Sequence, residues 1–200
     1  DDPSLSDEEI AAISTWARSG TPKGDVADAP EALVFDDATK WKLGEPDLIV
    51  NTEDFFMEAG RPDWWGEIPS IPTGLTKDRY VKSIEIVEVN DVGEGAEASD
   101  TVGGLFIFHH MIWRTEVLDE NGDVIPGEAV NWPVHEVGRN GDVFDPDAGP
   151  LLKANSAFYT DSVHMHSNGR DTTGHLQLGF TFHPEGYEPK YRSRVSTLGN

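Results

Sequence analysis

Short runs of β-branched and aromatic residues, separated by clusters of Gly, Pro, Asn and Asp, constrain the fold of this chain most strongly. Such runs predict β-strands, and the clusters between them predict turns. Their spacing favours an antiparallel sandwich over a fold built from βαβ units. We therefore expect a mainly β protein with an antiparallel, jelly-roll-like β-sandwich. The expected strands cover residues 48–50, 80–89, 105–117, 156–166 and 176–182, and residues 51–79, with prolines at 62, 69 and 72, are expected to form a long loop.

The first forty residues have a different character. Ser6 and Glu9 form a capping-box pattern, and Ile10, Ile13 and Trp16 follow at helical spacing. This pattern predicts one short helix over residues 7–18. Residues 21–40 are rich in Pro, Ala and Asp, which is typical of a linker. We expect an N-terminal helix and acidic linker over residues 1–40 and a sandwich domain over residues 41–200.

The charge of the chain limits its partners. Fifteen Lys and Arg against 37 Asp and Glu give a net charge of −22, which repels nucleic acid and anionic membranes. No apolar run approaches the roughly 18 residues of a membrane span. The chain begins Asp1-Asp2-Pro3, with neither a signal peptide nor an initiator Met, so we expect a mature or internal piece of a longer protein. A secreted or periplasmic location suits this acidity.

The chain has no cysteine, so a disulfide framework and a thiolate metal site are both excluded. Histidine is then the natural candidate for binding a transition metal. Four of the seven histidines occur as two close pairs on expected strands, His109 with His110 and His164 with His166. A single histidine on an apolar strand is usually structural, but two such pairs in one small domain point to a metal site.

Strand geometry predicts different side-chain directions for the two histidine pairs. Residues two apart on a strand share a face, so His164 and His166 can face the same point, whereas neighbours point to opposite faces. His109 and His110 can reach one metal only if the strand twists or bulges there, or if one ring binds through Nδ1 and the other through Nε2. Otherwise one of them is a core histidine bonded to a backbone carbonyl.

The ligand types favour copper. Neutral imidazole suits Zn, Cu, Fe and Ni, and the common zinc motifs are lacking. Met111 and Met165 carry thioethers that would favour Cu(I), although core packing is the default for both. We therefore predict one copper ion bound by His109, His110, His164 and His166, with His135 and Met111 as candidates for an extra ligand or a supporting residue. His175 and His183 are expected to be structural or exposed.

Two other kinds of metal site are suggested by parts of the sequence. A zinc site for hydrolysis would need a general base, for which Asp161, Asp171 and Glu136 are candidates by proximity in sequence. The segment 119–123 places Asp119, Asn121 and Asp123 at alternate positions, as a calcium loop does, but Val124 stands where such a loop needs Gly. Asn121-Gly122 instead predicts a hairpin turn.

Several motifs carry a family resemblance when they are taken in order. They are Trp41-x-Leu43-Gly44-x-Pro46-Asp47-Leu48, Pro72 to Thr76, His109-His110, Val137 to Asn140, Gly149 to Lys153, Val163 to Gly169 and Gly179 to Lys190. This order resembles the N-terminal domain of bacterial copper type II, ascorbate-dependent monooxygenase-like proteins, relatives of the peptidylglycine α-hydroxylating and dopamine β-monooxygenases.

The resemblance implies a fold of two jelly-roll-like sandwiches, each binding one copper. It implies that His109, His110 and His164 hold the electron-transfer copper, with His166 as an alternative or additional ligand. The oxygen-activating copper would belong to a second sandwich, which this chain lacks.

Residues 5–25 resemble the last helix and tail of small c-type cytochrome domains. Those domains attach haem through Cys-x-x-Cys-His, which this chain lacks. We therefore expect no haem in this chain.

Together these features predict the copper-binding, electron-transfer type domain of a secreted monooxygenase-like protein. Monooxygenase activity would require a second copper domain or chain, and an electron donor such as ascorbate or a cytochrome. A homo-oligomer is a further expectation. The alternative is a non-catalytic β-sandwich used for extracellular assembly or attachment.

Overall fold

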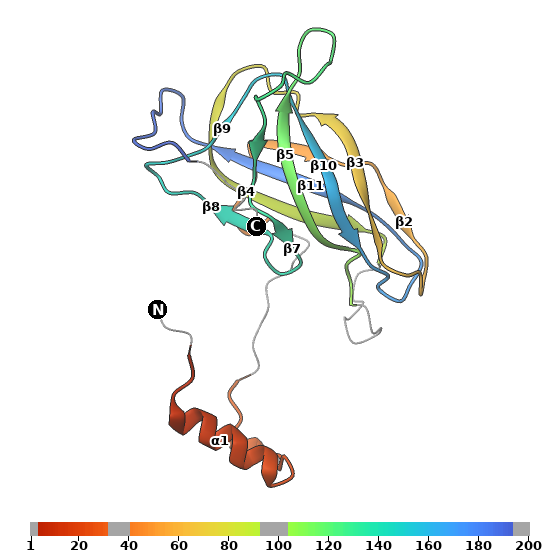
Figure 1. Ribbon diagram of the computed structural model, residues 1–200, viewed down its shortest axis with the longest axis vertical. Coiled ribbons are helices and arrows are strands. Elements are labelled where there is room, and N and C mark those ends of the chain that lie inside the picture. Colours follow the sequence, from red (N-terminus) through yellow and green to blue (C-terminus); the bar gives the residue numbers. More distant parts are fainter. Residues whose placement is uncertain (1–3, 32–40, 93–103, 194–200) are drawn as a thin grey trace. The chain divides into compact units, whose positions relative to one another are not determined.

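The computed structural model describes residues 4–31, 41–92 and 104–193. The chain divides into two compact units, Asp1–Asp36 and Asp37–Asn200. All described strands lie in the second unit, where two antiparallel sheets pack face to face (Figure 1). The predicted mainly β sandwich with one short N-terminal helix is confirmed.

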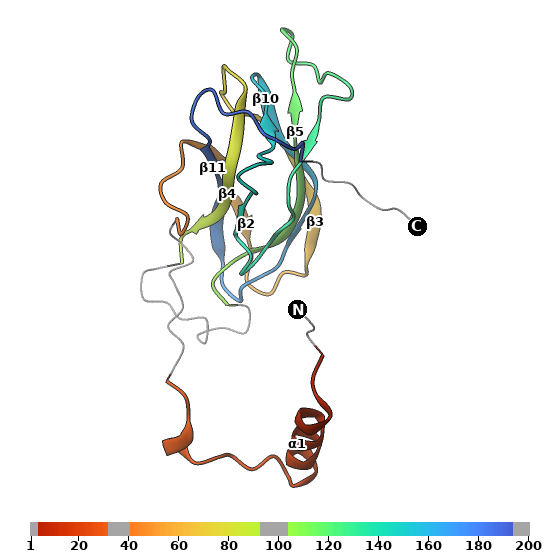
Figure 2. The same ribbon diagram turned by 90° about the vertical axis from the view of Figure 1, so that its left-hand side faces the viewer.

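The first sheet has six strands. Its main order is β1 (Leu48–Asn51), β11 (Thr172–Phe182), β4 (Arg79–Asn90) and β8 (Gly141–Val143). Two short strands extend it, because β2 (Phe55–Met57) pairs with β11 and β9 (Leu151–Leu152) pairs with β4. Seen edge-on in Figure 2, β4 and β11 belong to one layer of the sandwich and β3, β5 and β10 to the other.

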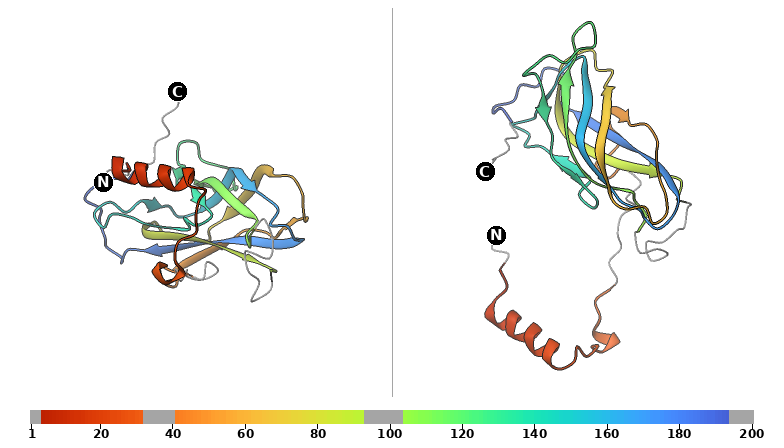
Figure 3. Two further views of the ribbon diagram at one scale, coloured as in Figure 1. Left: turned by 90° about the horizontal axis from the view of Figure 1, so that it is seen from below. Right: turned by 45° about the vertical axis from the view of Figure 1, so that its right-hand side comes forward.

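The second sheet has five strands and carries the histidine pairs. Its order is β3 (Trp64–Pro72), β10 (Ser156–Met165), β5 (Phe108–Val117) and β6 (Val130–Asn131), and β7 (His135–Glu136) also pairs with β5. The gold, blue and green strands β3, β10 and β5 run side by side in Figure 3, right. Residues far apart in sequence, such as His110 and His164 or Trp65 and His164, are thereby neighbours in space.

The core lies between the two sheets. Phe108, Met111 and Trp113 of β5 are buried in it, whereas Ile112 between them is 56% exposed. Trp113 also donates a hydrogen bond from its indole N–H to the carbonyl oxygen of Pro133, at 2.9 Å. The inward side chains of β5 therefore anchor the strand in the core, and the side chains between them point to the outer face of the sheet.

The prediction of a long loop over residues 51–79 is wrong, because β2 and β3 lie there. β3 is at the edge of its sheet, where a proline can avoid the hydrogen-bonding ladder, so Pro69 and Pro72 do not prevent strand pairing. A Cβ built on Gly66 would lie 2.1 Å from the Trp64 ring, so a larger residue there would force that ring to move.

The N-terminal unit contains α1 (Asp7–Arg18) and the short 3₁₀ helix η1 (Val26–Asp28). Ser6 caps α1: its backbone N–H donates to Glu9 Oε2 at 2.8 Å, and its hydroxyl accepts from the Glu9 N–H at 3.3 Å. The predicted capping box and helix bounds are confirmed. Neither helix in the described part of the chain is long and apolar enough to cross a membrane.

The predicted turn at Asn121-Gly122 is also confirmed. Leu118 and Val124 pair across it, and Gly122 adopts φ +86°, a left-handed conformation that glycine accepts without strain. The Asp119 carboxylate accepts hydrogen bonds from the backbone N–H groups of Asn121 and Asp123, at 2.8 and 2.9 Å. These acidic and amide residues thus stabilise a tight turn.

Candidate metal centre

Three histidine side chains converge on the outer face of the five-stranded sheet. His109 Nδ1 lies 2.9 Å from His164 Nδ1, and His164 Nδ1 lies 3.4 Å from His110 Nδ1. One nitrogen from each ring falls within 4.8 Å of the other two, a spacing that could hold a metal ion. Of the four histidines predicted as ligands, the structure places these three in one group.

A bulge lets adjacent residues share a face. His164 pairs with His110, but the next residue of β10, Met165, pairs with Phe108, so His109 is an extra residue in the ladder. Such an insertion bends the strand and redirects side chains. Of the alternatives that the sequence leaves open for the adjacent pair, the structure has the bulge, and the contacts between the rings use Nδ1 throughout.

Asp63 orients the third histidine. Its Oδ2 lies 3.0 Å from His164 Nε2 on the side of the ring away from the cluster. A carboxylate accepts hydrogen bonds, so this contact favours the proton on Nε2 and leaves the Nδ1 lone pair facing the other two imidazoles. A carboxylate behind an imidazole is the usual support of a histidine that binds a metal.

Trp65 covers the same ring. Its indole stacks on His164 with ring centres 4.2 Å apart and planes 8° apart, and it meets His110 edge-on at 5.0 Å. The register explains this contact, because Trp65 of β3 pairs with His164 of β10. Trp65 remains 57% exposed, so it forms one wall of the cluster that faces solvent.

The surroundings of His110 favour its neutral imidazole. Burial, followed by the charges of His164 and His109, lowers the pKa of His110, while Glu136 opposes this shift. A neutral ring offers a lone pair to a metal, whereas a protonated ring offers none. Burial, together with the two neighbouring imidazoles, therefore lowers the proton affinity of His110 and keeps its lone pair available.

Glu88 fixes the backbone just before the histidine pair. Its buried carboxylate accepts hydrogen bonds from the N–H groups of Ile107 and Phe108 at 2.9 Å, and from the Asn90 amide at 2.8 Å. From the other side, the Val137 N–H donates to the His109 carbonyl at 2.9 Å. The backbone of residues 107–109 is therefore held from two directions. This fixes the position of the backbone that carries the histidine rings.

His166 lies beside the cluster. Its ring stacks on His109, with centres 4.9 Å apart and planes 13° apart, and its centre is 6.5 Å from that of His164. Burial, followed by the charge of His109, lowers its pKa. His166 follows the last residue of β10 and does not belong to the three-histidine group.

The two other predicted supporting residues are buried. His135 is 5% exposed and Met111 is fully buried, and the two are paired across β7 and β5. Met111 is part of the hydrophobic core. Burial, followed by the charge of His110, lowers the pKa of His135 to about 4, so its ring is neutral at pH 7.

His175 and His183 have other neighbours. His175 Nδ1 lies 2.8 Å from Asp54 Oδ1. His183 stacks on Tyr187 with ring centres 3.8 Å apart. Neither ring contributes to the three-histidine group.

The three candidate bases for zinc hydrolysis differ in their surroundings. Asp161 is paired with Arg114 at 3.2 Å, and Asp171 accepts a hydrogen bond from the Ala59 N–H at 2.8 Å. Glu136 is opposite His110 in the β5–β7 ladder. Only Glu136 is paired with a residue of the cluster.

Sequence reasoning missed Asp63, Trp65 and Glu88. The first two lie in or next to β3, where the sequence predicts a loop, and the paired tryptophans are the only signal of them in the sequence. No protein-family model matches this chain, and no curated protein or solved structure matches it either. The class that fold and site define is therefore a β-sandwich with a three-histidine cluster that could hold a metal ion.

Proposed function

We propose that this chain is the copper-binding, electron-transfer type domain of a secreted monooxygenase-like protein. The observation that supports this most is the convergence of the Nδ1 atoms of His109, His110 and His164 at 2.9 and 3.4 Å. Three imidazoles facing one point would repel one another if they were protonated. As neutral rings, they present lone pairs that a bound cation can share. The order of motifs along the chain is the second support.

The donor set fits copper. It consists of neutral nitrogen ligands without thiolate, and such sites bind Cu(II) more tightly than Zn(II) in the usual order of affinities. His109, His110 and His164 would hold the ion, and copper supplies one-electron redox chemistry when it is bound. Three protein ligands leave room for a further ligand from solvent.

The surrounding residues have separate roles in this proposal. Asp63 fixes the tautomer and direction of His164, and Trp65 restricts how far that ring can turn. His109 is exposed, so an electron donor can approach the site from solvent. The donor would be ascorbate or a cytochrome, and oxygen activation would need a second copper domain or chain.

A second candidate function is non-catalytic assembly or attachment outside the cell. The observation that favours it is the apolar side of α1, where Ile10, Ile13 and Trp16 are 49%, 53% and 50% exposed. Exposed apolar side chains on one helix face are typical of a surface that meets a partner. This function would leave the histidine cluster without a role.

Metal stoichiometry of variants tests the proposal. His164→Ala should abolish stoichiometric copper binding, because it removes a nitrogen that lies within 3.4 Å of a nitrogen of each other ring. His175→Ala is the matched control, since it removes a histidine that also pairs with an aspartate but lies outside the cluster. Unchanged copper content in the His164 variant, measured by elemental mass spectrometry after dialysis against copper, would contradict the proposal.

A further inference from the structure

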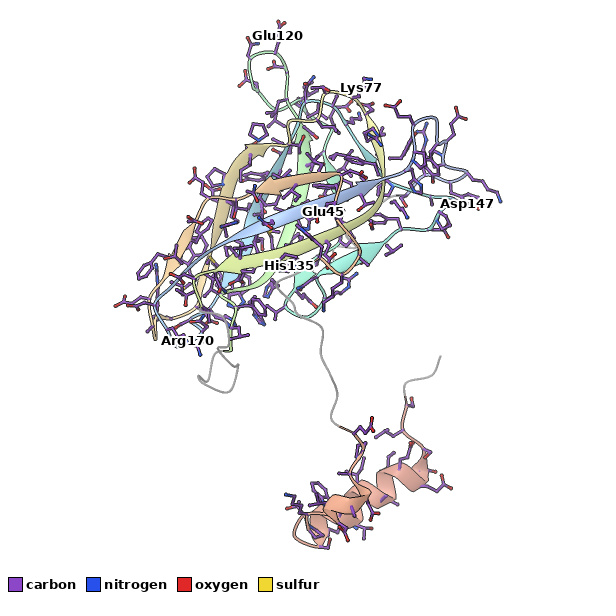
Figure 4. All side chains as sticks on the ribbon, turned by 180° about the vertical axis from the view of Figure 1, so that it is seen from behind. Glu45, Lys77, Glu120, His135, Asp147 and Arg170 are labelled. Atoms are coloured by element: carbon purple, nitrogen blue, oxygen red, sulfur yellow. The ribbon has the colours of Figure 1, made fainter. Side chains whose placement is uncertain are left out.

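Three buried polar atoms lack hydrogen-bond partners among the described residues: His183 Nε2, His135 Nδ1 on β7 and Asn140 Oδ1 just before β8. The last two belong to residues that lie close together in sequence. His135, labelled in Figure 4, is 5% exposed, so solvent does not satisfy its ring nitrogen. A buried polar atom without a partner destabilises the folded protein, so the His135 and Asn140 atoms are each expected to have a partner.

Both atoms belong to residues that line one small cavity. The other lining residues are Glu88, Phe106, Phe108 and Val137. The space open to the centre of a water molecule in it is about 10 Å³. That volume accommodates one water molecule, which needs two to four polar partners to be held in a protein interior.

We infer that this cavity binds a single water molecule, held by His135 Nδ1 and Asn140 Oδ1. The water donates one hydrogen bond to the Asn140 oxygen. It meets His135 Nδ1 either as donor or as acceptor, according to the tautomer of the ring, so either tautomer is satisfied. The site goes beyond the proposed function, because it needs no metal.

A cation fits this cavity less well than water. Among the described residues that line the cavity, Glu88 is the only carboxylate, and its two oxygens already accept hydrogen bonds from the N–H groups of Ile107, Phe108 and Asn90. The positive ends of these N–H dipoles point toward the same oxygens that a cation would need. Only one amide oxygen and one imidazole nitrogen would remain, which is too few ligands for a buried ion.

The bound water would join segments that support the histidine pair. His135 is paired with Met111, next to His110, and the Asn140 carbonyl accepts a hydrogen bond from the Ile86 N–H of β4 at 2.7 Å. The water therefore bridges the two ends of the turn between β7 and β8. That turn also contains Val137, whose N–H holds the His109 carbonyl.

A crystal structure of the metal-free protein at about 1.2 Å resolution tests the inference. We expect one fully occupied water within hydrogen-bond distance, about 3.2 Å, of both His135 Nδ1 and Asn140 Oδ1. A cavity without density, or a direct hydrogen bond between the two side chains, would overturn it. Density with the short distances and ligand number of a metal ion would also overturn it.

Two variants give an independent check in solution. Asn140→Asp keeps an oxygen acceptor and should retain the water, whereas Asn140→Leu removes the acceptor and should expel it. Magnetic relaxation dispersion of water ¹⁷O counts long-lived internal waters, and we expect the leucine variant to lose one relative to both the wild type and the aspartate variant. Equal counts in all three folded proteins would contradict the inference.

Discussion

Asp63 Oδ2 and His164 Nε2 lie 3.0 Å apart, on the side of the imidazole opposite the nitrogen that meets His109 and His110. This single contact links the edge of β3 to the centre of the histidine cluster. The contact orients the His164 ring, because it favours a neutral tautomer whose lone pair points toward the other two imidazoles.

The first prediction concerns this contact. Asp63→Asn should weaken copper binding roughly 10- to 100-fold, since the partner that fixes the tautomer of His164 becomes a group that can also donate. Competition titration with a chromophoric chelator measures the change. Asp54→Asn is the matched control, because Asp54 makes the same kind of contact with His175 at 2.8 Å. An equal loss in both variants would show that the Asp63 contact has no special role.

The second prediction uses Trp65 as a reporter. Its indole is stacked on His164 at 4.2 Å, so Cu(II) bound to the cluster should quench its fluorescence. Trp65→Phe should remove most of the copper-dependent quenching while leaving the stoichiometry at one ion. Trp16→Phe serves as the control, because Trp16 is similarly exposed but lies on α1. Quenching of the same amplitude in the Trp65 variant would place the metal elsewhere.

The sequence predicts the histidine cluster better than its surroundings. The two histidine pairs on apolar strands indicate a metal site, and the need for a bulge at His109 follows from the alternation of strand side chains. Asp63 and Trp65 could not be found in this way, because three prolines made residues 51–79 look like a loop. An edge strand tolerates those prolines, and only the register of β3 against β10 brings Trp65 over His164.

Glu88 shows a different limit of sequence reasoning. It lies in a run that was expected to be a strand, but nothing local shows that its carboxylate is buried or that it pairs with backbone twenty residues later. That partnership depends on how the two sheets pack. The fold class follows from local patterns, whereas the groups that fix the histidine backbone follow from tertiary contacts.

The third prediction follows from this role of Glu88. Glu88→Ala should lower the free energy of unfolding by on the order of 3 kcal/mol, because it leaves the N–H groups of Ile107 and Phe108 buried without their acceptor. Urea denaturation of the metal-free protein measures it. In the control Glu128→Ala, loss of the partly exposed ion pair with Lys153 should cost at most about 1 kcal/mol. Similar losses in both variants would contradict the assigned role.

The fourth prediction concerns the stability of the protein in acid. Burial lowers the pKa of His135 from 6.5 to about 4, so between these values the unfolded chain binds more protons at this residue than the folded chain does. The contribution of His135 to the free energy of unfolding is fully present above pH 6.5 and is lost as the pH falls toward 4. The loss is about 3 kcal/mol in the free energy of unfolding.

Comparison with His135→Gln isolates this effect. Burial raises the pKa of Glu88, which gives stability that is lost as the pH rises, so the two groups act in opposite directions. Both proteins contain Glu88, and the difference between their stability curves therefore reports His135 alone. Urea denaturation between pH 4 and 7 should show a smaller loss in acid for the variant, and parallel curves would refute the assignment.

The central claim is that the cluster of His109, His110 and His164 is a redox copper site. The most direct measurement is the metal content of the protein as isolated, by elemental mass spectrometry, paired with an EPR spectrum of the same sample after oxidation. We expect close to one copper per chain and a type II signal with nitrogen ligands. A protein that contains no transition metal and takes up none when copper is added would contradict the claim.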